Sequence, residues 1–385
     1  MTLKLLHIIT DEKFPDAAYE QFEEILPGAS TYLLPGRKSP IVYLKKIKPV
    51  RVSHFSFLNP FFIQSLNNYD AIILHSMTPF TLELIARANS KVIFVWIGLG
   101  YDYYDLIYPN PYDMLEEETA KIVKKTIPSF ETPKSSSFLK SILKSLIYSN
   151  QKNKIEVIQK VKIFCPVLPE EGEIIEEKIG KLKPKIVQWN YASHVSLFNY
   201  NLDKCTSNNI LVGNSATPTN NHYEIFKELS KLKLSKNTKV IVPLSYGDSK
   251  YREEVIKAGY NLLGHHFNPV TKFLEINEYI KIVKSCSIII MNHIRQQGVG
   301  NITIGLYMGA KIFLNEKNPL YKNYINKGFT IYSTETLHIS NDRDINRLPP
   351  EETKINQLLL QKHSSTEKVK IKTENLIKEI KLAKN

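Results

Sequence analysis

The sequence predicts an α/β protein with two Rossmann-like domains and a C-terminal helix. Short apolar runs rich in β-branched residues alternate with helical patterns in both halves of the chain. This alternation is typical of parallel sheets flanked by helices. A length of 385 residues exceeds one ordinary core. The polar, Asn- and Ser-rich segment Val195–Asn209 is suited to an interdomain linker.

The first half predicts one doubly wound sheet. Apolar runs with turn residues at their ends indicate buried strands, and apolar positions three and four apart indicate helices. The expected strands are Leu3–Ile9, Ala71–His75 and Val92–Gly98, and the expected helices are Asp16–Leu26 and Pro79–Asn89. These elements predict a first domain over residues 1–195.

The second half repeats this alternation of strand and helix patterns and predicts a second domain over residues 205–345. The expected strands are Asn209–Gly213, Lys239–Leu244, Leu262–Leu263, Ser287–Met291, Lys311–Leu314 and Ile331–Tyr332. The expected helices are Asn221–Lys231, Lys250–Ala258 and Asn277–Ser285, with a short one after residue 301. A tail over residues 350–385 contains Glu351–Lys384, a Lys- and Glu-rich stretch expected to form a helix that packs on the body.

The composition indicates a soluble globular protein, with 43% hydrophobic residues and a mean hydropathy of −0.23. No apolar run approaches the ~20 residues of a membrane span. The N-terminal apolar run is too short for a secretory signal and fits a first strand. Cys165, Cys205 and Cys286 lack metal-ligand spacing and are expected to be reduced. A cytoplasmic location is therefore expected.

The net charge of +13 favours anionic partners. Nucleic acid, an anionic bilayer and phosphorylated substrates all fit. Solvated lysines encoded by an AT-rich genome explain the same excess, so the charge alone leaves these alternatives open.

The loop Asn292–Asn301 is the strongest candidate for a ligand site. It follows a predicted buried strand and precedes a helix, whose first N–H groups and dipole favour a phosphate. A structural turn needs only one or two polar residues, and this loop has more. Side-chain donors are expected from Arg295, Gln296, Gln297 and Asn301, with close backbone approach at Gly298 and Gly300.

Two further loops end strands of the same predicted sheet. One contains Gly213, Asn214, Ser215 and Thr217, and the other contains Tyr246. Both suit a nucleoside diphosphate or its sugar, because ligands of open α/β sheets bind at the carboxyl ends of strands. The alternatives are an ordinary strand-to-helix turn, with Asn220 or Asn221 as helix N-cap, and a glycine turn with an exposed tyrosine. The first loop lacks the GxGxxG pattern of dinucleotide sites.

Four stretches of the second half carry a family resemblance. They are NILVGNSATPTNNH (Asn209–His222), VPLSYGD (Val242–Asp248), RQQGVGN (Arg295–Asn301) and FLNEKNP (Phe313–Pro319). In this order and spacing they resemble the enterobacterial-common-antigen fucosaminyltransferase family. Its members are described as TDP-N-acetylfucosamine:lipid II N-acetylfucosaminyltransferases. The resemblance is best over residues 205–335 and is loose in the first half.

This resemblance implies a GT-B fold, with two Rossmann-like domains facing across a cleft. It implies transfer of a deoxy-amino sugar, 4-acetamido-4,6-dideoxygalactose, from a dTDP-sugar donor. The implied acceptor is a saccharide on polyprenyl diphosphate, at the cytoplasmic face of the inner membrane, in surface polysaccharide synthesis. No cofactor and no metal are expected, because helix dipoles and donors stabilise the leaving diphosphate in such enzymes.

The resemblance also places a tryptophan-glycine-acid segment after a strand, here Val95–Asp105. Asp102 is the candidate base that would take the acceptor's proton in an inverting mechanism, with Asp105 behind it. The spacing between Trp96 and the acid is looser here than in the family pattern. A Tyr-rich acceptor loop without a catalytic base is the alternative. His75, at another strand end, is a further candidate.

Two segments bear on a membrane. Ser135–Tyr148 has an apolar stripe with lysines beside it, which suits either a bilayer interface or core packing. The basic and aromatic region Tyr43–Phe62 would extend the same surface.

Two other functions remain possible from the sequence. A sugar-nucleotide epimerase of GT-B-like architecture needs acid and base groups at the sugar and no membrane-facing surface. A nucleic-acid-binding protein needs arginine and aromatic residues gathered on one exposed face, whereas the basic residues here are mostly lysines spread along the chain.

Overall fold

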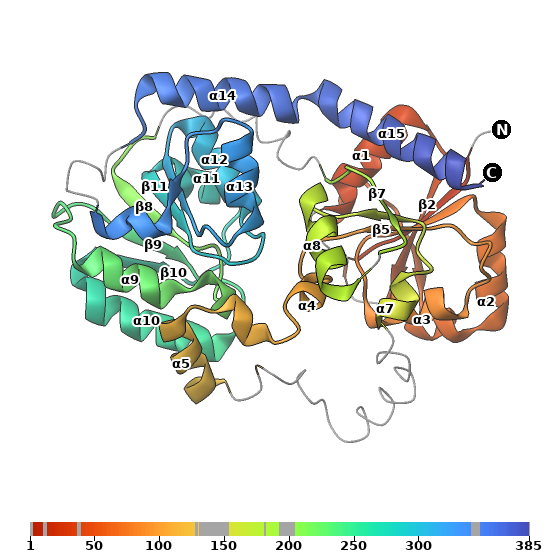
Figure 1. Cartoon of the computed structure of the whole chain (residues 1–385), viewed down its shortest axis with the longest axis horizontal. Coiled ribbons are helices and arrows are strands. Elements are labelled where there is room, and N and C mark those ends of the chain that lie inside the picture. Colours follow the sequence, from red (N-terminus) through yellow and green to blue (C-terminus); the bar gives the residue numbers. More distant parts are fainter. Residues whose placement is uncertain are drawn as a thin grey trace. The chain divides into compact units, whose positions relative to one another are not determined.

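The computed structural model describes residues 3–10, 14–36, 40–127, 130, 154–180, 182–191, 205–339 and 347–384. These residues form two compact α/β units (Figure 1). The first unit comprises the described residues of 1–109, 154–191 and 364–384, and the second those of 110–130 and 205–363. Each unit contains one parallel sheet, so the predicted fold class is confirmed. In the described part of the chain, no helix combines the length and hydropathy of a membrane span.

The sheet of the first unit has seven strands in the order β3-β2-β1-β4-β5-β6-β7. Its strands are β1 (Leu5–Ile8), β2 (Ser30–Pro35), β3 (Val50–Val52), β4 (Ala71–Leu74), β5 (Phe94–Ile97), β6 (Ile163–Cys165) and β7 (Lys185–Ile186). Leu5 of β1 pairs with Ser30 of β2 and with Ala71 of β4. The central strands are buried on both faces, which explains their continuous apolar sequences.

Helices cover this sheet (Figure 1). They are α1 (Pro15–Ile25), α2 (Pro60–Ser65), α3 (Pro79–Arg87), α4 (Tyr104–Ile107), α7 (Lys154–Ile158), α8 (Pro169–Ile179) and α15 (Thr366–Lys384), with the 3-10 turns η1 (His54–Leu58) and η2 (Leu66–Asn68). Proline at the start of α1, α2, α3 and α8 fixes φ where a backbone N–H has no helical partner.

The sheet of the second unit has six strands in the order β10-β9-β8-β11-β12-β13. The strands are β8 (Asn209–Val212), β9 (Val240–Pro243), β10 (Phe267–Val270), β11 (Cys286–Met291), β12 (Lys311–Leu314) and β13 (Tyr332–Ser333). The helices are α5 (Glu117–Thr126), α9 (His222–Ser230), α10 (Ser249–Leu263), α11 (Ile276–Lys284), α12 (Val299–Met308), α13 (Pro319–Asn326) and α14 (Pro350–Ser364).

Both strand orders reverse direction beside the first strand of their unit. In the first unit the reversal lies between β1 and β4, and in the second between β8 and β11. Ligands of open α/β sheets bind outside the carboxyl ends of the strands at such a reversal. The candidate sites described below lie at these two places.

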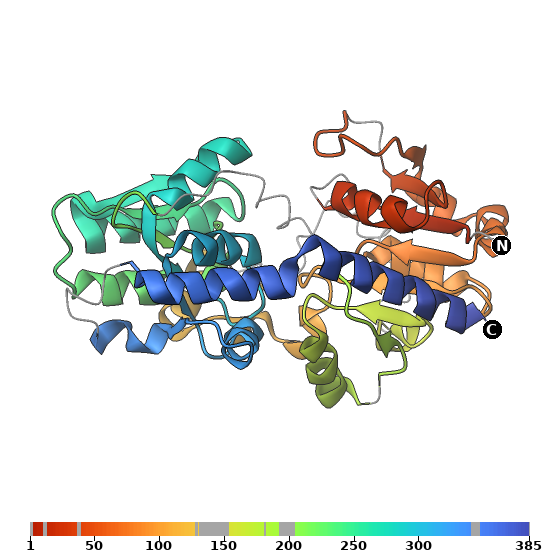
Figure 2. The same ribbon diagram turned by 90° about the horizontal axis from the view of Figure 1, so that it is seen from above.

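One predicted strand and the predicted tail differ from the structure. Leu262–Leu263 is the end of α10, which continues until Gly264, and the strand follows at β10. Gly264 has a φ of +53°, a conformation that ends a helix readily in glycine. The tail forms two helices, α14 and α15, which run one after the other (Figure 2).

The two units also differ from the predicted domain limits. Helix α5 belongs to the second unit, although the sequence assigned residues 1–195 to one domain. The Thr119 backbone N–H and hydroxyl donate to Glu224 of α9, and Val123 is buried in the core of the second unit. Helix α15 packs on α1 of the first unit. Ser135–Tyr148 and most of the predicted linker Val195–Asn209 lie outside the described residues.

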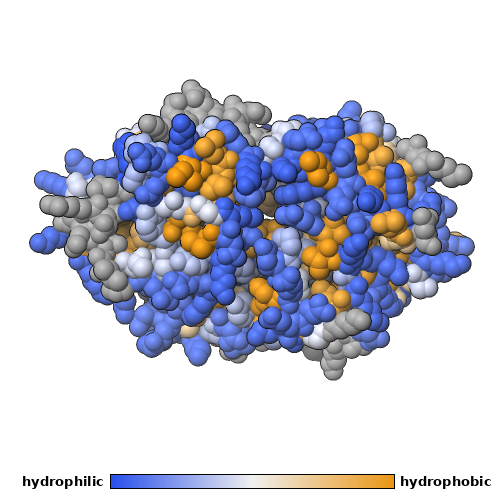
Figure 3. Space-filling view, turned by 45° about the horizontal axis from the view of Figure 1, so that its top comes forward, coloured by the Kyte–Doolittle hydropathy of each residue, from blue (hydrophilic) through white to orange (hydrophobic). Residues whose placement is uncertain are grey.

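The face displayed in Figure 3 is mostly hydrophilic, with separate hydrophobic patches among hydrophilic residues. This distribution fits the mean hydropathy of the chain. Single exposed apolar residues are ordinary on soluble proteins, so only a patch with a further property points to a partner.

Candidate functional site

Two predicted loops of the second unit touch through their backbones. The Ala216 N–H donates to the Tyr246 carbonyl at 2.7 Å, and the Asp248 N–H donates to the Ala216 carbonyl at 2.9 Å. Gly247 lies beside this contact with a φ of +121°, and a Cβ there would lie 2.4 Å from the Ala216 carbonyl atoms. Only glycine fits both the conformation and the approach.

A side-chain network joins the loop after β8 to the loop after β11. Gln297 Nε2 donates to Asn214 Oδ1 at 2.8 Å, and Thr219 Oγ1 donates to Gln297 Oε1 at 3.0 Å. His293 Nε2 lies 2.9 Å from Asn220 Oδ1 and 3.2 Å from Asn214 Oδ1. Because it faces two acceptors, this nitrogen carries the proton. The sequence predicted Gln297 and Asn214 as ligand contacts, and the structure brings them together.

Two fully buried histidines belong to this region: His293 in the loop after β11, and His222 at the start of α9. Burial lowers the pKa of His293 well below its ordinary value, and the Arg295 and His222 charges act in the same direction. Burial alone lowers the pKa of His222 to about 3. Gly213 lies against His222, because a Cβ at this position would approach His222 Nε2 to 2.8 Å. Both rings are therefore neutral near pH 7, and Gly213 is needed for packing.

Asn221 occupies the N-cap position of α9, one of the two alternatives that the sequence left open, but its side chain makes no capping hydrogen bond. Asn220 Oδ1 accepts from the Asn214 N–H at 2.8 Å, and its amide donates to Ser215 Oγ at 3.1 Å. Asn221 has a φ of +51°, accepts from the Glu116 N–H and donates to the Asn292 carbonyl. Neither side chain caps α9. Both instead hold the loop after β8 in its shape.

Ser215, Thr217 and Tyr246 lie together in this site. Ser215 Oγ is 2.9 Å from Thr217 Oγ1 and also forms a hydrogen bond with Tyr246. Burial raises the pKa of the Tyr246 hydroxyl, while the Ser215 bond and the charge of Arg295 oppose that shift. The Tyr246 side chain nevertheless remains half exposed. Because the charge of Arg295 lowers the pKa of Tyr246, the two side chains lie near each other.

The start of α12 completes the candidate donor site. Its N-cap is Gly298, with a φ of +75°, and glycine has no side chain to accept from the first helical N–H groups. Gly300 lies in the first turn, where a Cβ would meet no atom within 4 Å. Asn301 is buried and hydrogen-bonded to Tyr279. Unpaired N–H groups and the positive end of the helix dipole suit an anion.

The backbone of the loop before α12 accepts two side-chain hydrogen bonds. Asn318 Nδ2 donates to the Arg295 carbonyl at 3.0 Å, and Arg295 Nη1 lies 3.5 Å from the carbonyl of Gln296. Gln296 is buried. The sequence predicted a ligand-contacting side chain at Gln296, and the structure places that side chain inside the unit.

The histidine at the reversal point of the first unit is part of a buried chain. His75 Nε2 lies 3.0 Å from His7 Nδ1, and His75 Nδ1 lies 2.8 Å from the Tyr191 hydroxyl. Burial lowers the pKa of His75 to about 3 and lowers that of His7 as well. His75 thus holds β1 and β4 to Tyr191, and its role in catalysis stays a prediction.

Asp102 lies inside the first unit with 4% of its surface exposed. Its carboxylate accepts from Trp96 Nε1, the Met77 N–H and the Leu99 N–H, each at 2.8 Å. Burial raises the pKa of this carboxyl, and the three hydrogen bonds oppose the shift. Asp102 therefore joins the loops after β4 and β5, a geometry that favours positioning over proton transfer.

Asp105 has a different environment from Asp102. Its carboxylate is 57% exposed and forms an ion pair with Lys154 Nζ at 2.6 and 2.7 Å. Lys154 Nζ also donates to the Asp102 carbonyl at 3.0 Å. Of the predicted catalytic residues, Asp105 is the one whose carboxylate oxygens reach solvent.

Sequence reasoning missed a buried carboxylate near this segment. Glu171 of α8 accepts from the Tyr103 and Tyr104 hydroxyls, both at 2.6 Å. Burial raises its pKa. The tyrosine run is visible in the sequence. Nothing in its local pattern links Tyr103 and Tyr104 to an acid that lies 68 and 67 positions away.

Sequence reasoning also missed a pocket of about 70 Å³ at the carboxyl ends of β1, β2 and β4. Its lining includes Ile8, Pro35, His54, Phe57, Ser76 and Phe80. The His54 ring stacks on Phe80 with centroids 4.0 Å apart. Ser76 has a φ of +132°, an uncommon conformation for a residue with a Cβ. The pocket therefore combines an aromatic platform with a strained hydroxyl residue.

Among the described residues, no group of three or more His, Cys, Asp or Glu side chains is placed to hold a metal ion. Cys165, Cys205 and Cys286 are free thiols and buried.

Comparison with known structures places the whole chain in one architecture. The Anabaena HepE protein in complex with UDP and glucose matches with a TM-score of 0.55 at 11% identity, covering 99% of this chain and 94% of that one. An α,α-trehalose-6-phosphate synthase from Burkholderia multivorans matches with a TM-score of 0.60 at 7% identity, covering 99% of each. A glycosyltransferase from Rickettsia africae matches with a TM-score of 0.59 at 14% identity, covering 99% and 98%. The fold is GT-B.

A family match adds a second finding for this GT-B chain. Residues 191–348 match the glycosyltransferase group 56 family, described as 4-α-L-fucosyltransferases. The match includes all three loops of the candidate donor site. The resemblance to a family of this kind, drawn from those loops, is thereby confirmed. Family match and fold together support glycosyl transfer.

Proposed function

We propose that this GT-B protein transfers a deoxy-amino sugar from a dTDP-sugar to a saccharide on polyprenyl diphosphate. The sugar would be 4-acetamido-4,6-dideoxygalactose, and the reaction would serve bacterial surface polysaccharide synthesis. The enzyme would act as a peripheral protein at the cytoplasmic face of the inner membrane. The observation that carries this proposal is the network joining the loops after β8 and β11 at the start of α12.

The donor diphosphate would bind at the N-terminus of α12. The first N–H groups of that helix and the Arg295 guanidinium would stabilise the charge that develops as the sugar leaves. This set of donors carries the positive charge needed without a metal ion. The Tyr246 ring would contact the sugar or the base. The HepE complex with UDP supports a nucleotide in a fold of this kind.

The acceptor would bind to the first unit at the pocket beside β1 and β4. The His54–Phe80 stack gives an apolar platform for one face of a sugar ring, and Ser76 gives a hydroxyl. The exposed carboxylate of Asp105 would take the proton from the acceptor hydroxyl in an inverting reaction. Asp102 and His75 would hold the loops that present the acceptor.

Nucleotide binding tests the donor assignment directly. We expect dTDP to raise the thermal midpoint more than UDP, GDP or CMP do, without metal and unchanged by added Mg²⁺. Arg295→Ala should weaken dTDP binding about 10–100-fold, as expected for a charge-assisted contact to phosphate. Lys257→Ala is the matched control, because this exposed lysine of α10 lies in the same unit. Failure of all four nucleotides to bind would overturn the proposal.

A further inference from the structure

One region of the first unit combines exposed apolar side chains with an excess of basic residues, of which Lys46 is paired with Glu20 of α1. No Asp or Glu occurs between Glu24 and Asp70. Within that interval, residues 41–61 contain six of the 19 large hydrophobic residues that are exposed in the described part of the chain. We call this region the basic apolar face; its apolar members are Ile41, Val42, Tyr43, Val50, Phe55 and Phe61, and its basic members are Lys45, Lys46, Lys48 and Arg51.

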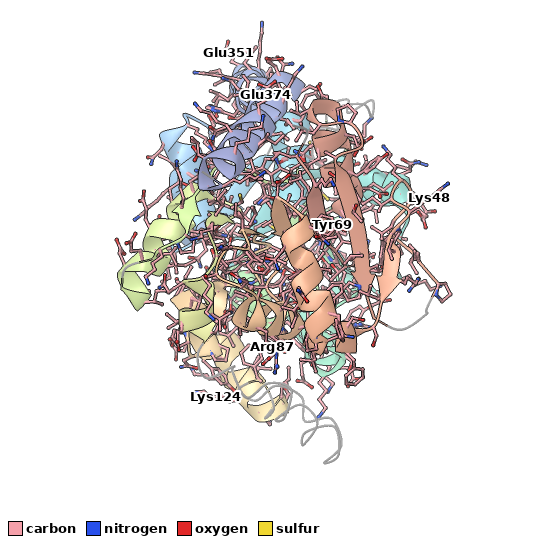
Figure 4. The ribbon with its side chains drawn as sticks, turned by 90° about the vertical axis from the view of Figure 1, so that its right-hand side faces the viewer. Lys48, Tyr69, Arg87, Lys124, Glu351 and Glu374 are labelled. Carbon is pink, nitrogen blue, oxygen red and sulfur yellow. The ribbon has the colours of Figure 1, made fainter. Side chains whose placement is uncertain are left out.

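The first part of this face is a loop that is fixed to the unit. Leu44 and Ile47 are buried in a core cluster. Asp16 of α1 accepts from the Lys45, Lys46 and Ile47 N–H groups at 2.7–3.2 Å. The anchored loop holds Val42 in solvent with 65% of its surface exposed. Lys48 projects from the periphery of the ribbon (Figure 4).

The second part of the face is formed by η1 and α2, at the periphery of the unit (Figure 1). Phe57 and Phe62 stack on each other, and Phe57 is fully buried. Phe55 and Phe61 are 63% and 82% exposed. Two of the four aromatic rings thus pack against the unit, while the other two are presented outward. The edge strand β3 connects this part to the anchored loop and adds Val50.

We propose that the basic apolar face inserts into an anionic lipid bilayer. Exposed aromatic and aliphatic side chains enter the interface between headgroups and acyl chains, while the surrounding lysines and arginine attract anionic headgroups. A second copy of this chain is a poor occupant, because two positive faces repel each other. Nucleic acid fits less well, because Ile41, Val42 and Val50 cannot stack on bases.

The pocket and the basic apolar face share the turn η1. His54 and Phe57 of η1 line the pocket, while Phe55 of the same turn lies on the outer face. A lipid-anchored saccharide would therefore meet the pocket close to the bilayer surface. The role of the face in delivering the acceptor rests on the proposed function. Binding of the face to a bilayer is measurable independently of that function.

Vesicle partitioning of the full chain tests the proposal. We expect binding to phosphatidylcholine vesicles containing 30% phosphatidylglycerol, and at least tenfold weaker binding of the F55S/F61S variant. The K45E/K48E variant should lose the dependence on phosphatidylglycerol. Phe273→Ser is the matched control, because Phe273 is 56% exposed but lies in the second unit, and it should bind like the wild type. The predicted segment Ser135–Tyr148 stays unchanged in every variant.

The thermal shift with dTDP and the circular dichroism spectrum report whether each variant is folded. Wild-type binding by F55S/F61S, or an equal loss in the Phe273→Ser control, would overturn the proposal. Equally tight, salt-dependent binding of single-stranded RNA that the same variants abolish would assign the face to nucleic acid instead. Vesicle binding without any nucleotide response would support bilayer binding by the basic apolar face and would contradict the proposed function.

Discussion

Asp102 and Asp105 stand three positions apart and differ completely in environment. Asp102 accepts three N–H groups in a buried site, and Asp105 is exposed beside Lys154. Asp102→Asn replaces one accepting oxygen by an NH₂ group that faces N–H donors. We expect a loss of about 2–4 kcal/mol in the free energy of unfolding, measured by urea denaturation.

Asp105→Asn is the matched variant for the catalytic role. It should change the free energy of unfolding by less than about 1 kcal/mol, because exposed ion pairs contribute little. Its turnover with donor and acceptor should fall at least ~10²-fold, as for loss of a general base. If the Asp102→Asn protein is stable and loses more turnover than Asp105→Asn does, the general base is Asp102 instead.

Gly300 gives a second test at the residue scale. A Cβ there meets nothing within 4 Å, and alanine in a helix is more stable than glycine by about 0.5–1 kcal/mol. Gly300→Ala should therefore raise the thermal midpoint of the protein without ligand. If the donor diphosphate approaches the backbone here, the same methyl group should weaken dTDP binding. Unchanged dTDP affinity would place the diphosphate elsewhere.

The sequence predicts that the loops after β8 and β11 hold one ligand between them, and the structure joins Gln297 to Asn214 by a hydrogen bond. Arg295 lies near Tyr246 of the loop after β9. That these side chains contact a ligand stays a prediction. Asp102 was a different case, because its burial depends on Met77 and Trp96 in the folded chain. A carboxylate at a strand end looks the same in sequence whether it faces a ligand or the protein interior.

At the scale of elements, α15 contributes to a core made by distant strands. Leu376 is fully buried beside Phe22 of α1, and Trp189 Nε1 donates to Thr373 Oγ1 at 3.1 Å. Leu376→Ala should lower the free energy of unfolding of the first unit by about 2–5 kcal/mol. Leu382→Ala is the control, since Leu382 of the same helix is exposed.

Calorimetry distinguishes the affected unit. If dTDP binds the second unit as proposed, its stabilisation should persist in Leu376→Ala while the transition of the first unit moves to lower temperature. A single transition that shifts as a whole would mean that the two units unfold together.

Strands were predictable where a buried apolar run is continuous, as in β4, β5 and β11. The strands β2, β3, β6 and β7 were missed. Strands β3 and β7 have two or three residues with little pattern, and β2 begins with the polar residues Ser30 and Thr31. The end of α10 was placed too early because Leu262 and Leu263 resemble a short strand. The break between α14 and α15 occurs at Ser365, in a stretch whose charge pattern continues through both helices.

At the scale of the whole molecule, each unit contains a pair of buried neutral histidines. They are His7 and His75 in the first unit, and His222 and His293 in the second. In the unfolded chain each has a pKa near 6.5. Between about pH 6.5 and pH 3 the unfolded chain binds protons that the folded chain does not, so stability falls as the pH falls. The slope is about 1.4 kcal/mol per pH unit for each histidine.

Urea denaturation between pH 7.5 and pH 5 measures this slope. Asp102 and Glu171, whose pKa values burial raises, act in the opposite direction. The decisive comparison is therefore with His222→Asn. This variant should reduce the pH dependence of the free energy of unfolding for the second unit and leave that of the first unit unchanged. An identical slope in wild type and variant would show that this histidine does not bind a proton on unfolding.

The division of the chain between units has a consequence for synthesis. The first unit needs α15, yet all described residues of the second unit from 205 to 363 precede that helix in the chain. At roughly 5–20 residues per second, about 10–40 s pass between the translation of residue 191 and that of α15. Throughout this interval α1 lacks the partner that covers Phe22 and Trp189. The unit whose translation begins first is therefore the last to complete its core.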